Sequence, residues 1–156
     1  MTPWLELAGA IAAVASPTPA SAPPAPTARR TVRLNMEQVF SLANAAKERG
    51  DLRVAEEAYE AMADDPDRQV RAEALFRHAK MLARAGRMER AATLFRRLLD
   101  ERPDAVAARL ELAHALDLMG DKDAAWRELR SAQASGLPSQ VARLVDRYSE
   151  ALRSAR

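Results

Sequence analysis

The sequence predicts an all-α protein, an α-solenoid of three helix-turn-helix repeats followed by a C-terminal capping helix. Gly50, Gly86 and Gly120 are separated by 36 and 34 residues. Similar residues stand five, nine and twelve positions after each glycine: Ala55, Tyr59 and Met62; Ala91, Phe95 and Leu98; Ala125, Leu129 and Ala132. Because one pair of antiparallel helices cannot bury its apolar faces alone, such copies must stack into one continuous core.

Each repeat is expected to consist of two helices joined at its glycine. Glycine ends the first helix because it adopts the left-handed conformation without steric cost. A small residue stands seven positions before each glycine and lets the paired helices approach closely: Ala43, Ala79 and Ala113. These positions place the three repeats at about residues 35–66, 70–103 and 105–137.

Residues 138–156 are predicted to form the capping helix. Apolar side chains recur there at steps of three and four, which indicates one packed helix face: Val141, Leu144, Val145, Tyr148 and Leu152. The opposite face is charged, as the last element of a repeat stack requires where it meets water: Arg143, Asp146, Arg147 and Glu150.

Residues 1–30 differ in composition from the rest of the chain. Residues 5–14 are mostly apolar, and Ala13-Val14-Ala15 before Ser16 has the form that a signal peptidase recognises. A linker rich in Pro and Ala follows to Thr27. We therefore expect a signal peptide, removed before Ser16, and export of the protein. No basic residue precedes Arg29, so a disordered tail is the alternative. The apolar run is too short to span a bilayer.

Composition and motifs argue against catalysis, metal binding and nucleic-acid binding. The 24 basic and 22 acidic residues are interleaved along the helices, which is typical of a solvated surface. His78 and His114 stand at different positions in their repeats, so a shared metal is not expected. Asp64, Asp65 and Asp67 are interpreted as helix caps, because a calcium loop would need further ligands. We predict no enzyme activity, no catalytic residues and no cofactor.

The predicted function is therefore binding of a protein or peptide partner. In stacked helix pairs the first helices line a concave side, where partners bind. An apolar column there contains Phe40, Phe76 and Leu110, for which core packing is an equally good explanation. A polar column has no such explanation and is expected to contact the partner: Asn44, Lys80 and His114, with Lys47, Arg84 and Asp117 beside them.

The repeats, with closing prolines at Pro66 and Pro103, resemble tetratricopeptide repeats. A finer resemblance covers roughly residues 32–154 and is most specific at Gly136-Leu137-Pro138 and residues 145–153; residues 91–104, AATLFRRLLDERPD, also contribute. There the chain is similar to the periplasmic N-terminal domain of the surface lipoprotein assembly modifier family. Members of that family have an exported leader, these repeats and an outer-membrane β-barrel that delivers lipoproteins or secreted proteins to the cell surface.

The resemblance reaches only to about Arg156, where the barrel of that family would begin. It therefore implies the partner-binding half: a periplasmic domain, associated with the outer membrane, that contacts a barrel or an exported lipoprotein client. The alternative is a stand-alone cytoplasmic scaffold for an unrelated complex.

Overall fold

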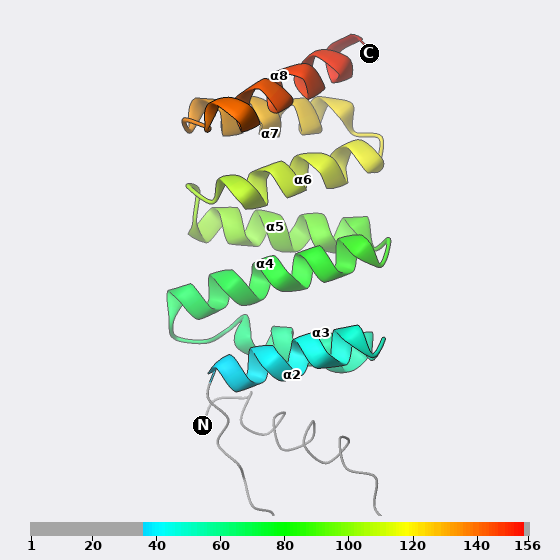
Figure 1. The fold of residues 1–156 in the computed structure, drawn as a ribbon, viewed down its shortest axis with the longest axis vertical. Helices are drawn as coiled ribbons and strands as arrows, with labels where there is room; N and C mark the ends of the chain where they lie inside the picture. Colours follow the sequence, from blue (N-terminus) through cyan, green and yellow to red (C-terminus); the bar gives the residue numbers. More distant parts are fainter. Residues whose placement is uncertain (1–35, 155–156) are drawn as a thin grey trace, which may run out of the picture. The chain divides into compact units, whose positions relative to one another are not determined.

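The computed structural model describes residues 36–154, and within them every regular element is an α-helix. The helices are α2 (Met36–Glu48), α3 (Leu52–Met62), α4 (Arg68–Arg84), α5 (Met88–Glu101), α6 (Val106–Leu118), α7 (Lys122–Ala134) and α8 (Ser139–Ser154), coloured from blue to red along the chain in Figure 1. This confirms the predicted fold class. The predicted leader, residues 1–30, lies outside the described residues.

The chain forms two compact units whose boundary falls inside α4, between Ala74 and Leu75. We call residues 36–74 the N-terminal unit and residues 75–154 the C-terminal unit. Between residues 36 and 154, no helix combines the length and the apolar character that crossing a membrane requires.

The three glycines of the repeat pattern end α2, α4 and α6 as predicted. At Gly86, φ is +76°, and the backbone N–H groups of Gly86 and Arg87 donate to the carbonyls of Ala83 and Leu82 at 3.0 and 2.9 Å. Two such bonds satisfy carbonyls that the last helical turn would otherwise leave unpaired. A Cβ at Gly86 would meet nothing within 4 Å, so the residue is required for its backbone conformation and not for space.

In the N-terminal unit α2 and α3 pack through small residues around one aromatic ring. Ala43, Ala55 and Tyr59 are fully buried, and the ring of Phe40 lies 6.4 Å from that of Tyr59. The loop after α3 leads into α4 and supplies its cap. The carboxylate of Asp67 accepts the backbone N–H of Gln69 at 2.7 Å, which confirms its interpretation as a helix cap.

In the C-terminal unit the core consists of apolar residues from α4 to α8. Phe95 on α5 is completely buried, and its ring meets that of Phe76 edge-on, with centroids 6.1 Å apart. Leu112 and Leu116 of α6 and Leu129 of α7 are each at most 2% exposed. The bulky residues predicted nine positions after each glycine are therefore all in the core.

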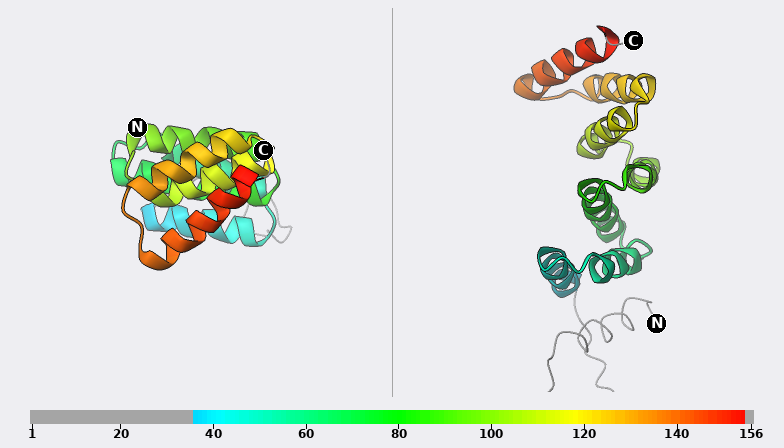
Figure 2. Two further views of the ribbon diagram at one scale, coloured as in Figure 1. Left: turned by 90° about the horizontal axis from the view of Figure 1, so that it is seen from above. Right: turned by 90° about the vertical axis from the view of Figure 1, so that its right-hand side faces the viewer.

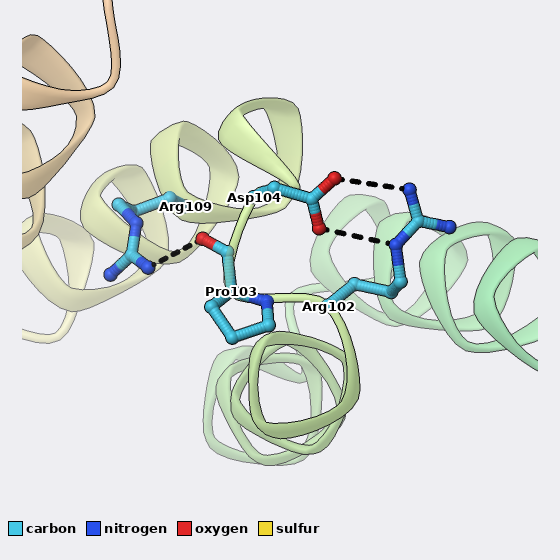
Figure 3. A network of polar contacts seen from close by, with 4 residues as sticks. All are labelled: Arg102, Pro103, Asp104 and Arg109. Atoms are coloured by element: carbon cyan, nitrogen blue, oxygen red, sulfur yellow. Dashed lines mark hydrogen bonds and ion pairs between the residues drawn. The ribbon is translucent and has the colours of Figure 1, made fainter.

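The turn between α5 and α6 is fixed by two arginines (Figure 3). Arg102 reaches both carboxylate oxygens of Asp104 at 3.2 Å, and this hydrogen bond and charge raise the pKa of the guanidinium. Arg109 on α6 donates to the carbonyl of Pro103 and to Glu128 of α7, each at 3.0 Å. The Arg109–Glu128 pair is mostly buried, so it links α6 firmly to α7.

The last helix, α8, packs through a face rotated from the predicted one. Val145 and Leu152 are buried as expected, but Leu144 is 59% exposed and Ser149 is buried in its place. Both views in Figure 2 show α8 inclined to α7. Val145, Ser149 and Leu152 recur at steps of four and three and share one helix face, whereas Leu144 lies about 100° around the helix from Val145. The prediction that Leu144 packs in the cap is wrong.

Candidate functional site

The nine predicted partner-binding residues lie on three helices. They are Phe40, Asn44 and Lys47 on α2, Phe76, Lys80 and Arg84 on α4, and Leu110, His114 and Asp117 on α6. None of the nine is buried. Their contact with a partner remains a prediction, and the structure adds an internal role for several of them.

Asn44 has a packing role that the repeat pattern did not indicate. Its side-chain oxygen accepts hydrogen bonds from the hydroxyl of Tyr59 at 3.0 Å and from Lys47 Nζ at 3.3 Å. A buried tyrosine hydroxyl needs a polar partner, because leaving it without one costs about 1–3 kcal/mol. The expectation that the polar column has no role in packing is therefore wrong for Asn44.

A polar hollow of about 340 Å³ brings three other predicted residues together. Lys80, Arg84 and His114 line it, with Met88 of α5 and Glu111 of α6. Lys80 pairs with Glu111 at 3.1 Å and lies 5.4 Å from the centre of the Phe76 ring. The side chains of Arg84 and His114 form no hydrogen bond or ion pair with any other of residues 36–154. His78, by contrast, is buried on α4.

A second hollow, of about 610 Å³ and almost entirely apolar, lies between α6, α7 and α8. Its walls include Leu110, Leu129, Val141, Leu144, Val145 and Tyr148, and Arg147 also borders it. Of these, only Leu110 was predicted to contact a partner. The sequence predicts the apolar stripe of α8 but places all of it, Leu144 included, in the packing of the cap.

Asp117, a predicted partner contact, also forms a hydrogen bond to α8. The hydroxyl of Tyr148 donates a hydrogen bond to a carboxylate oxygen of Asp117. Burial of the phenol, together with this bond and the negative charge of Asp117, raises the pKa of Tyr148 from 10.0 to about 12. The bond thus connects the last helix to α6.

Raised pH is expected to weaken this connection. A phenol whose pKa is higher in the folded than in the unfolded state stabilises the fold below pH 10, and that contribution is lost as pH rises toward 12. Urea unfolding measured across this range should show a steeper loss of stability for the wild type than for Tyr148→Phe. Equal slopes would contradict the raised pKa, as would phenolate absorbance of Tyr148 appearing at its ordinary pH.

Two family models match this chain, both described as tetratricopeptide repeat, over residues 40–106 and 82–148. No curated protein matches it. Solved structures resemble it in fold. The Yersinia enterocolitica type III secretion translocator chaperone SycD has a TM-score of 0.65 at 18% identity, covering 77% of this chain and 84% of SycD.

Two further structures contain a bound partner. The TPR2B domain of yeast Sti1, solved as a complex with pHsp70, has a TM-score of 0.64 at 18% identity. The match covers 78% of this chain and 98% of the Sti1 chain. Pseudomonas aeruginosa PcrH, in complex with the chaperone binding region of PopB, has a TM-score of 0.59 at 18% identity. The match covers 75% of this chain and 93% of the PcrH chain. At this identity the likeness shows a shared fold.

Proposed function

The chain belongs to the tetratricopeptide repeat family, and we propose that it is a protein-interaction module that binds a segment of a partner polypeptide at the polar hollow between α4 and α6. The observation that carries this proposal is the meeting of Lys80, Arg84 and His114 in one hollow, with Arg84 and His114 forming no polar contact within residues 36–154. Side chains with hydrogen-bond donors and no internal partner are available to a ligand. A carboxylate or amide group of the partner would receive charge-assisted hydrogen bonds there.

We further propose that the module works in the periplasm, as part of a system that delivers proteins to the outer surface of the cell. Three observations support this. The start of the sequence has the form of a signal peptide. Residues 32–154 resemble the periplasmic domain of the surface lipoprotein assembly modifier family. Among the structures of similar fold, SycD is a type III secretion translocator chaperone, and PcrH is bound to the chaperone binding region of PopB. The client would be an exported lipoprotein or a barrel of the outer membrane.

Site-specific photo-cross-linking in living Gram-negative cells tests both parts. A photoreactive amino acid in place of Arg84 should capture a discrete protein partner, and the product should appear in the periplasmic or outer-membrane fraction. The same group in place of Arg127, an exposed residue on the second helix of its repeat, should capture much less. Cross-linking confined to the cytoplasm would overturn the periplasmic role, and equal capture at both positions would overturn the binding site.

The captured partner then allows an affinity measurement. Combining Lys80→Gln with Arg84→Glu should weaken binding by about 1.5–3 kcal/mol, the value of hydrogen bonds to charged groups. The fold should persist, because Lys80 and Glu111 are each about one-third exposed and such pairs add little stability. A matched control combines Arg96→Glu with Arg127→Glu on the second helices. If the control weakens binding as much as the test variant, charge in general, and not this hollow, governs affinity.

A further inference from the structure

The polar hollow and the apolar hollow share α6 as a common wall. Leu110 borders the apolar hollow, and His114, one helical turn further along α6, borders the polar one. Residues four apart lie on the same face of a helix. A single extended segment crossing α6 on this face can therefore reach both hollows.

The charged groups around the two hollows favour one kind of ligand. Three cationic residues line them, Lys80, Arg84 and Arg147, against one acidic residue, Glu111, which is already paired with Lys80. The side chains of Arg84 and Arg147 make no hydrogen bond or ion pair within residues 36–154. A positively charged segment would be repelled there, whereas an acidic one would be attracted.

The apolar hollow is large enough for side chains of the ligand. Its volume of about 610 Å³ lies within the range of about 300–1,000 Å³ that is typical of ligand sites. Leu144 on its wall is 59% exposed, so covering that leucine would remove apolar surface from water.

We infer that the C-terminal unit has a two-part site for an acidic, apolar polypeptide segment. One or more apolar side chains of the segment occupy the hollow between α6, α7 and α8, close to Arg147. A carboxylate of the segment is bound by Arg84, Lys80 and His114. Packed helix axes are about 8–10 Å apart, a distance that about three residues of extended chain span, so we expect the two groups of the segment to be separated by about three residues. This inference rests on the proposed function and names the chemistry of the partner.

Selection from a random peptide library displayed on phage tests the inference with the full chain as bait. The enriched peptides should share an apolar residue and an acidic residue about three positions apart. Fluorescently labelled copies of the most enriched peptide then provide the ligand for measuring affinity by fluorescence anisotropy.

Matched variants assign each half of the peptide to its hollow. Leu144→Ser should lower the affinity for the peptide about tenfold. A peptide whose apolar residue is replaced by serine should bind this variant and the wild type equally. Arg84→Glu should lower affinity to a similar extent and remove the preference for the acidic residue. Leu118→Ser and Arg127→Glu are the controls. Leu118 is 56% exposed, close to the value for Leu144, but it borders neither hollow.

The outcomes separate the inference from the proposed function. If no peptide is enriched over an unrelated bait and photo-cross-linking at position 84 captures no partner, the proposed function fails. If peptides are enriched but lack the acidic and apolar pair, or bind Leu144→Ser and Arg84→Glu as tightly as the wild type, only the two-part site is overturned. Enrichment of basic peptides would likewise overturn it.

Discussion

Replacing Phe95 by alanine is expected to lower the free energy of unfolding by about 3–5 kcal/mol. The Phe95 side chain is completely buried in the core of the C-terminal unit and packs edge-on against Phe76. Truncation removes apolar surface that folding takes out of water and leaves a cavity that the surrounding helices fill only in part. Since the whole stability of a domain is about 5–15 kcal/mol, this single change removes a large part of it.

Urea unfolding followed by circular dichroism measures this effect as a shift of the midpoint. Arg96→Ala is the matched control, because Arg96 is exposed next to Phe95 on the same helix, and its replacement should change stability by less than about 0.5 kcal/mol. Similar midpoints for the two variants would show that Phe95 does not organise the core.

The fold class was predictable from sequence because its determinants are local. A glycine whose φ lies near +80° must recur wherever a first helix ends, and an alanine must recur wherever two helices approach closely. Both requirements leave a period in the sequence. Tyr59, Phe95 and Leu129, predicted from that period to fill the core, are at most 2% exposed.

The contacts of the candidate site were less predictable because they depend on how neighbouring helices are inclined. Asn44 was expected to face a partner, yet it accepts a hydrogen bond from Tyr59, fifteen residues away. Asp117 is similarly joined to Tyr148, thirty-one residues away. Repeat register shows which face of a helix a residue occupies. It does not show which polar atom from another helix comes within bonding distance.

The capping helix illustrates the same limit for apolar residues. Periodicity identified the stripe that contains Leu144 and Leu152, and an isolated stripe gives no reason to treat the two leucines differently. The face of α8 that packs on the repeats includes Leu152, which is 4% exposed, and excludes Leu144, which is 59% exposed. The apolar hollow depends on which face of α8 packs on the repeats, so sequence alone could not reveal it.

Deleting residues 138–156 is expected to cost about 3–6 kcal/mol of stability and to make unfolding less cooperative. The deletion removes Val145 and Leu152, both nearly buried, and full burial of such a side chain contributes about 1.5–3 kcal/mol. It also uncovers the side of α7 that α8 packs against, and removes the hydrogen bond from Tyr148 to Asp117. In a repeat protein each element is stabilised mainly by its neighbours, so the loss weakens α6 and α7 directly.

Thermal unfolding followed by far-ultraviolet circular dichroism should give a lower and broader transition for the truncated chain. Two point variants separate removal of packing from removal of a helix: Leu152→Ala should cost about 2–5 kcal/mol, and Leu144→Ala much less, because only Leu152 is buried. If the truncated chain melts as sharply and at the same temperature as the full chain, α8 does not cap the repeats. Equal losses at the two leucines would contradict the observed rotation of α8, and with it the exposed wall of the apolar hollow.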